Sequence, residues 1–409
     1  MALRRALVTL MLLSCASSEK NATVALVTGA ETDVFTRAPA PKTLTIGAID
    51  KDGVERDLAT TPLPATGVDL GNLDIGTVLR VQVRARDEQG KVLVAGRSTP
   101  ILAGDRDSVP VFVQRTGELA RMPGPFPTAP SSPMVEVVFG RYLFLATRGS
   151  TATQVYDFET LAPLSVAPAL PVAARSIVAQ GANLYVVGDR VMALNVSTGE
   201  VFNVTAPGDA AEVAGAIAVH GDGGAAYLVG ATREGDVATD RSWVLGADGK
   251  LTARALSAPR KGAVAAFVTA KGLFVSSTDA PPELVSADSA TPLGYPAPTA
   301  RPLAAAALDD HSVVVVDEDG GVLRYDLGCR SGCTAEVWAA GPKTAHATVL
   351  AIDSARILYA GDDGGAILAK AERRPLTIRE ARVAPRLFAL PTLGIGLVGG
   401  ATTLESFVP

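Results

Sequence analysis

An apolar segment returns about every 42 residues through most of this 409-residue chain, and each copy ends at Gly, Asp, Ser or Thr. The copies begin at Tyr142, Leu184, Tyr227, Leu273, Val313, Ile357 and Ile395. A period of this length matches a unit of four short β-strands and is too long for a leucine-rich repeat. The repeat therefore predicts an all-β fold in which seven four-stranded sheets form a seven-bladed β-propeller.

A segment rich in small side chains precedes most of the apolar copies. Ala214–Val219, Ala263–Val268 and Leu303–Leu308 are three examples. In a propeller the first strand of each blade faces the central axis, where bulky side chains from all the blades would collide. We therefore expect these segments to be the inner strands, and the apolar copies to be the second strands, buried between neighbouring blades.

The last repeat is incomplete, because only three strand-like segments fit before the chain stops at Pro409. Residues 116–122, just before the first repeat, have the pattern of an outer strand. We expect this segment to complete the final blade, which closes the ring and removes an exposed sheet edge. The predicted propeller therefore spans residues 116–409.

Residues 22–113 read as a separate domain of alternating strands. Val78–Arg86 places apolar and polar side chains on opposite faces, and Asp50–Gly53 and Asp87–Gly90 have hairpin-turn sequences. The strand spacing predicts a β-sandwich of immunoglobulin-like type, although the Cys and Trp residues typical of true immunoglobulin domains are missing. The proline-rich segment Arg121–Pro133 marks the passage into the propeller.

The N-terminus has the pattern of a secretory signal, with Arg4 and Arg5 before the apolar run Ala6–Leu13. The sequence that ends at Cys15 resembles the lipobox of bacterial lipoproteins. This resemblance implies that residues 1–14 are removed, that Cys15 is acylated and inserts in a lipid bilayer, and that residues 15–21 form a tether. In such lipoproteins an Asp directly after the Cys favours retention at the inner membrane. Here that residue is Ala16, so the resemblance implies the outer membrane. A plain signal peptide or an uncleaved N-terminus is the alternative.

The two remaining cysteines, Cys329 and Cys333, lie in a short turn that contains glycine. Outside the cytoplasm such a pair is expected to form a disulfide. A redox role or a metal site is the alternative, and a metal would need two further ligands that the neighbouring sequence lacks.

Charge and motifs exclude several functions. The chain has 37 basic and 42 acidic residues, a net charge of -5, and no dense basic block after its first residues, so nucleic acid is not an expected partner. No nucleophile-elbow, phosphate-loop or dinucleotide motif is present. The Asp- and Gly-rich turns are expected to be hairpin turns, not calcium loops. His220, His311 and His346 fall at different places in their repeats, so a shared metal site is not expected. With the motifs above also missing, we predict no metal, no cofactor and no catalytic residue.

Four arginines fall near the start of an inner strand: Arg175, Arg260, Arg301 and Arg386. That position lies close to one mouth of the central channel. Such side chains commonly solvate a rim, and the alternative is a site for an anionic ligand. We select these four as the candidate ligand-binding residues.

Local patterns in the repeats resemble two propeller families. The segment from Leu184 to Glu200 is similar to the repeat of quinoprotein-type propellers and of outer-membrane assembly lipoproteins, whereas Ala258-Pro-Arg260, Ala384-Pro-Arg386 and Val398-Gly-Gly400 are closer to kelch repeats. The resemblance implies a fold more than an activity. We expect a non-catalytic envelope lipoprotein whose propeller binds a protein or a glycan. The alternative is a propeller enzyme, a hydrolase, lyase or quinoprotein, with its active site at one mouth.

Overall fold

The structure is a computed structural model. It describes residues 23–64, 77–103, 108–130, 133–205, 213–214, 216–221, 226–230, 239–268, 271–286 and 289–409. The predicted signal peptide, Cys15 and the tether lie outside these residues. All the secondary-structure elements in the described part of the chain are strands. None of its segments is a helix long and apolar enough to cross a membrane.

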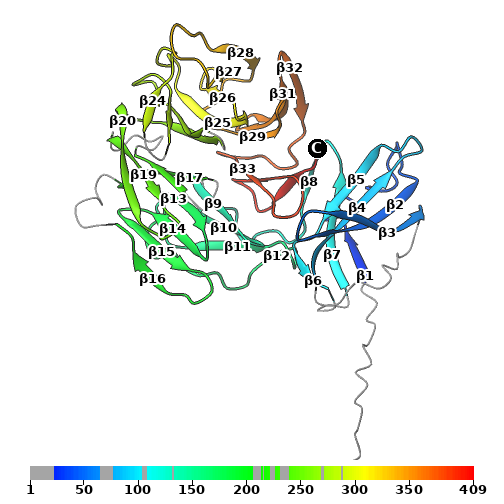
Figure 1. The fold of residues 1–409 in the computed structure, drawn as a ribbon. Coiled ribbons are helices and arrows are strands. Elements are labelled where there is room, and N and C mark those ends of the chain that lie inside the picture. The colour runs from blue at the N-terminus through cyan, green and yellow to red at the C-terminus, as the bar shows by residue number, and fades with distance from the viewer. Residues whose placement is uncertain are drawn as a thin grey trace, which may run out of the picture.

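Seven four-stranded antiparallel sheets form a ring, and Figure 1 shows them arranged around a central axis. Blade 1 contains β9 (Met134–Phe139), β10 (Tyr142–Thr147), β11 (Thr153–Asp157) and β12 (Ala162–Pro163). Blade 2 contains β13 (Ser176–Gln180), β14 (Asn183–Val187), β15 (Val191–Asn195) and β16 (Val201–Asn203). Blade 3 contains β17 (Ile217–His220), β18 (Ala226–Val229), β19 (Thr239–Leu245) and β20 (Leu251–Arg260). The predicted seven-bladed β-propeller is confirmed.

The remaining blades follow the same order from the axis outward. Blade 4 contains β21 (Val264–Val268), β22 (Gly272–Ser276), β23 (Glu283–Val285) and β24 (Ala290–Pro292). Blade 5 contains β25 (Pro302–Asp309), β26 (Ser312–Asp317), β27 (Gly321–Asp326) and β28 (Glu336–Ala340). Blade 6 contains β29 (Ala347–Asp353), β30 (Arg356–Gly361), β31 (Gly364–Ala369) and β32 (Glu372–Leu376). Blade 7 contains β33 (Arg386–Ala389), β34 (Ile395–Val398), β35 (Glu405–Phe407) and β8 (Leu119–Arg121).

Side-chain size decides which strand lies where. In blade 5 the inner strand β25 contributes four consecutive alanines, which are paired with the valines of β26. All of β26 is buried, as expected for a strand with a neighbouring blade on each face. The β-branched valines fill the space between blades, while the alanines leave room near the axis.

The outer strand of blade 7 comes from upstream of the first repeat. Strand β8 pairs antiparallel with β35, with Leu119 opposite Phe407 and Arg121 opposite Glu405. Leu119 and Phe407 are both buried, and they pack together in one apolar cluster. Segments almost 300 residues apart in the chain therefore share one sheet (Figure 1).

The N-terminal region differs from the two-sheet sandwich that the sequence predicted. Its strands are β1 (Thr23–Val27), β2 (Thr43–Asp50), β3 (Glu55–Pro62), β4 (Val78–Arg86), β5 (Val92–Arg97), β6 (Ile101–Leu102) and β7 (Ser108–Arg115). The described strands form one sheet in the order β1-β7-β5-β4-β2-β3, and β6 also pairs with β4. Ser98 bonds to Val81 between the two pairings, so β5 and β6 follow the same edge of β4, and the described strands stay in one sheet.

The N-terminal sheet is joined directly to blade 7, because β7 runs into β8 through only three residues. The Gln114 side chain on β7 hydrogen-bonds to the backbone and the hydroxyl of Ser406 on β35. Arg379 lies 3.5 Å from Glu31 of the N-terminal region. Phe112 packs with residues of blades 1 and 7 in a shared apolar cluster. The sheet therefore supports the blade where the ring closes.

Candidate functional site

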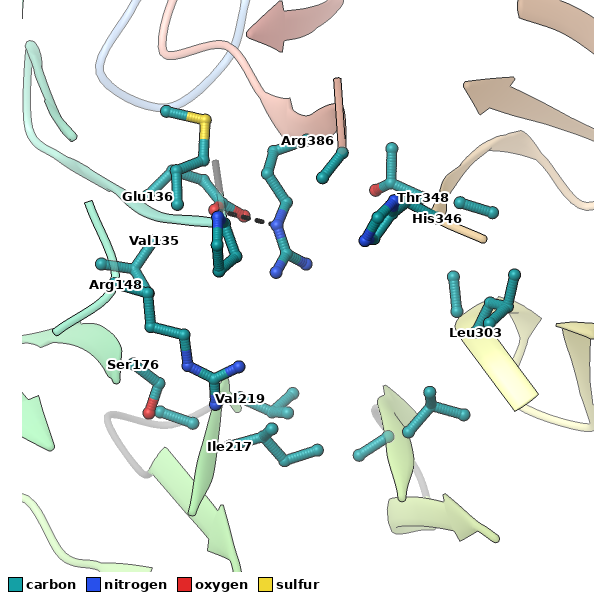
Figure 2. Close-up of a pocket in the computed structure, with 18 of the residues that line it drawn as sticks. Val135, Glu136, Arg148, Ser176, Ile217, Val219, Leu303, His346, Thr348 and Arg386 are labelled. Atoms are coloured by element: carbon teal, nitrogen blue, oxygen red, sulfur yellow. Dashed lines mark ion pairs between the residues drawn. The ribbon is translucent and has the colours of Figure 1, made fainter. Parts of the chain in front are cut away.

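A cavity of about 250 Å³ lies on the propeller axis, at the end where the inner strands begin. Residues from or next to all seven inner strands line it, and we call it the mouth cavity (Figure 2). Each blade contributes residues at the start of its inner strand, so the identity of those residues decides the chemistry of that part of the wall. All seven blades therefore contribute to one small cavity.

One side of the mouth cavity is charged and polar. Blades 1, 2, 6 and 7 supply the side chains of this polar half: Glu136, Arg148, Arg175, Ser176, His346, Thr348 and Arg386. Figure 2 shows Arg148, His346 and Arg386 directed toward the open centre from different blades. Among the described lining residues, three guanidinium groups against one carboxylate make this half basic, although the whole chain has a net charge of -5.

The other side of the mouth cavity is aliphatic. Blades 3, 4 and 5 contribute the residues of this apolar half: Ile217, Ala218, Val219, Ala263, Val264, Ala265, Leu303, Ala304 and Ala305. Figure 2 shows Ile217 across the centre from Arg386, and Leu303 across it from Arg148. The predicted small residues of the inner strands thus form one wall of the site.

An ion pair connects two strands of the polar half. Arg386 Nε on β33 lies 3.7 Å from Glu136 Oε2 on β9, and their side chains are 39% and 20% exposed. Burial raises the pKa of the Glu136 carboxyl, and the nearby Arg386 charge acts in the opposite direction. The mouth pair, as we call Arg386 and Glu136, therefore combines a partly exposed cation with an acid that holds its proton more readily than usual.

His346 is held at the rim by an aspartate between blades 6 and 7. Its Nδ1 lies 2.8 Å from Asp362 Oδ2, and the other oxygen of Asp362 accepts a 2.7 Å hydrogen bond from the Ala384 backbone. Thr348 Oγ1 also accepts a hydrogen bond from the Leu387 backbone. These contacts fix the orientation of His346 beside the start of β33.

Of the four predicted arginines, Arg175 and Arg386 line the mouth cavity. Arg301 does not. Its Nε lies 3.4 Å from Glu318 Oε2, and both side chains are more than 40% exposed. Arg301 follows the expected rim behaviour, because it forms an exposed ion pair away from the cavity.

Arg260 is the clearest correction to the sequence prediction, because it is fully buried and lies away from the mouth cavity. Its Nε donates a 2.6 Å hydrogen bond to Glu283 Oε1, and Nη2 donates to the Pro281 carbonyl at the same distance. The other Glu283 oxygen accepts from the Ser257 backbone. A charge with this many buried partners holds the chain together and cannot reach a ligand.

A second pair repeats this arrangement in blade 7. Arg382 bonds to Glu405 and to the Thr403 carbonyl, and both members of the ion pair are fully buried. The other Glu405 oxygen accepts from the Arg379 backbone, three residues before the arginine, as Ser257 is before Arg260. Each glutamate begins the third strand of its blade and lies 23 residues after its arginine. We call these two pairs the junction pairs.

Sequence reasoning missed five residues of the polar half, the hydroxyl side chains of Ser176 and Thr348 and three ionisable ones. Within the described part of the chain Glu136 is the one acidic side chain that lines the mouth cavity, and its position in an otherwise apolar strand was the available signal. Arg148 follows a second strand, so a search limited to inner strands could not find it. His346 was considered only as a metal ligand, yet it lines the cavity.

The two remaining cysteines lie away from this site. Cys329 and Cys333 form a disulfide in the turn after β27, with their Cα atoms 6.4 Å apart. No group of three or more His, Cys, Asp or Glu side chains that could hold a metal occurs among the described residues. The disulfide packs against the cluster between blades 4 and 5.

Comparison with known proteins supports the fold only. No protein-family model matches the chain, and no curated protein matches it. Among solved structures, the chain is similar to the WD40 β-propeller domain of Doa1, with a TM-score of 0.53 and 12% identity. The match covers 70% of this chain and 96% of that domain. The fold is a seven-bladed β-propeller. At this level of identity the likeness says nothing of ligand or activity.

Proposed function

We propose that this protein is a binding protein anchored by lipid at Cys15 in the bacterial outer membrane, and that it binds an anionic group of an envelope protein or glycan at the mouth cavity. The observation that carries this proposal is the basic half of the mouth cavity in a chain of net charge -5. Arg175 and Arg386, together with Arg148, are the proposed contact residues. Guanidinium groups suit this role because they can form two parallel hydrogen bonds to one anion.

The architecture supports recognition as the task. A propeller places loops from all its blades around one axis, and a WD40 propeller is among the solved structures that this chain is similar to. The proposal of a lipid anchor rests on the sequence around Cys15 and on Ala16. The N-terminal sheet is then a spacer between the membrane and the ring, joined to the ring at blade 7.

An enzyme is the second candidate, and Glu136 is the observation that favours it. A carboxyl group whose pKa is raised by burial inside a cavity is a candidate general acid. Two-carboxylate glycoside chemistry would need a second acid, and among the described residues Glu136 is the one carboxylate that lines the mouth cavity. In this alternative the protein is a lyase or hydrolase that uses Glu136 together with Arg386.

The test is crosslinking capture from intact cells with four forms of the full chain. Wild type is compared with Cys15→Ala, Arg386→Gln and Arg301→Gln, the last being a matched control at an ion-paired arginine outside the cavity. We expect Cys15→Ala to leave the membrane fraction. Arg386→Gln should lose its captured partner, and Arg301→Gln should keep it. Unchanged fractionation would refute the anchor, and equal capture by both arginine variants would refute the mouth as the binding site.

A further inference from the structure

We propose that the mouth cavity binds an aliphatic carboxylate, with the carboxylate on the arginines of blades 1, 2 and 7 and the hydrocarbon on the wall formed by blades 3, 4 and 5. This inference rests on the proposed function and specifies its ligand. The same chemistry has two sources, a small free carboxylic acid or the C-terminal residue of a polypeptide with an aliphatic side chain.

The arrangement of donors points to this ligand. Among the residues that the structure describes, the guanidinium donors of the mouth cavity lie in its polar half, on Arg148, Arg175 and Arg386, together with the His346 ring. On the opposite wall the described lining residues are Ile, Val, Leu and Ala, and none of these has a side-chain donor. A bound anion must therefore satisfy its oxygens from one side, while the rest of the molecule contacts hydrocarbon.

A carboxylate meets this requirement better than a phosphate. Its two oxygens lie in one plane at one end of the molecule, so a guanidinium on one side can bind both. The oxygens of a phosphate point in several directions, and some would face the aliphatic wall without donors, where an unsatisfied charged group is costly. The chemistry of the two walls thus favours a single planar anion.

The size of the cavity sets the length of the ligand. Its volume of about 250 Å³ is at the small end of ligand sites. Ile217, Val219 and Leu303 offer branched aliphatic contacts on this wall, which fits one short hydrocarbon chain or one Leu-like side chain. A long acyl chain or a sugar ring with hydroxyls on every face would not match this wall.

Calorimetric titration of the full chain with defined probes tests the inference. The probes are hexanoate, hexanamide, hexyl phosphate and the peptide acetyl-Ala-Ala-Leu as free acid and as amide. We expect hexanoate or the free-acid peptide to bind at least about tenfold more tightly than its uncharged partner, because the amide cannot form charge-assisted bonds to the arginines. Preference for hexanoate identifies a small free acid, and preference for the peptide identifies a chain end.

Three variants locate the binding. Arg386→Gln should weaken binding of the preferred probe by about tenfold or more, whereas Arg301→Gln should leave it unchanged. Ala304→Asp, on the aliphatic wall, should weaken hexanoate more than acetate. Tighter binding of hexyl phosphate, equal binding of acid and amide, or no effect of Arg386→Gln would overturn the inference. If the carboxylates fail while capture from cells still depends on Arg386, the proposed function stands and only this ligand class is wrong.

Discussion

Arg260 and Arg386 follow the same Ala-Pro dipeptide, yet they occupy opposite environments. Arg260 is fully buried against Glu283 at a junction between blades, whereas Arg386 is 39% exposed and lines the mouth cavity beside Glu136. The difference comes from the position of each arginine relative to the start of the inner strand that begins at or after it. Arg260 lies four residues before the first residue of its inner strand, and Arg386 is itself that first residue.

This contrast separates two tasks that one residue type performs in the same fold. The junction pairs are fully buried and each arginine donates several hydrogen bonds, so removal of one partner leaves an uncompensated charge in the protein interior. The mouth pair is longer and partly wet, so its arginine can exchange partners at low cost. We expect changes at the junctions to affect folding and changes at the mouth to affect binding.

The largest effect on stability is expected from removing β8, the strand that completes blade 7. A chain that lacks residues 1–122 has no β8, which leaves β35 and Glu405 at an open sheet edge. Such an edge promotes aggregation, and the ring loses its closure. We expect no cooperative unfolding transition and no monomer in size-exclusion chromatography. A stable monomer of this truncated chain would show that closure by β8 is dispensable.

A junction arginine is expected to have the next largest effect. Arg260→Met leaves Glu283 charged and buried, which should lower the free energy of unfolding by about 3–5 kcal/mol in urea denaturation. The double variant Arg260→Met with Glu283→Met should recover most of this loss, because both charges are then gone. A loss of under about 1 kcal/mol in the single variant would contradict the structural role of the junction pair.

The mouth arginine should behave differently in the same assay. Arg386→Gln removes an ion pair that is 3.7 Å long and partly exposed, so the free energy of unfolding should fall by less than about 1 kcal/mol. Urea denaturation beside Arg260→Met measures the difference directly. Equal destabilisation by the two variants would erase the distinction between junction and mouth.

The smallest effect concerns pH and Glu136. Burial raises the folded-state pKa of this carboxyl above its ordinary value of 4.5, so the native state binds its proton more readily than the unfolded state. The stability that Glu136 contributes is then fully present below that ordinary value and is lost as pH rises through the folded pKa. Arg148, Arg175, His346 and Arg386 face the same cavity and are present in both proteins that are compared.

Urea denaturation of wild type and Glu136→Gln across about pH 4 to 7 measures this effect. The stability of wild type relative to the variant should decline as pH rises and then level off. A difference that stays flat, or that rises with pH, would show that burial does not control the titration of Glu136.

The sequence predicted the ring because its repeat records a geometric requirement. The period, the alanines of the inner strands and the apolar second strands each follow from packing around an axis, and the seven sheets lie where these patterns placed them. Residues 116–122 read as an outer strand, and β8 is paired at that position. Alternation within Val78–Arg86 predicted a strand correctly but carried no information on how many sheets the N-terminal strands form.

The site was predicted only in part, because side-chain direction depends on register within a few residues. Ala-Pro-Arg is the same at the end of blade 3 and at the start of blade 7, and nothing local separates a junction arginine from a mouth arginine. The shared 23-residue spacing from Arg260 to Glu283 and from Arg382 to Glu405 was the available signal. Arg148 could not be found, because its approach to the axis depends on the closed ring.

Site-specific photocrosslinking in blade 5 tests the central claim most directly. A photoreactive residue is placed at Ala304, which lines the mouth cavity, or at Val337, which is 74% exposed on the outer strand of the same blade. The account predicts crosslinks to the bound partner from position 304, lost in Arg386→Gln, and none from position 337. Crosslinks from position 337 alone would place recognition on the outer wall of the ring and contradict a binding site at the mouth.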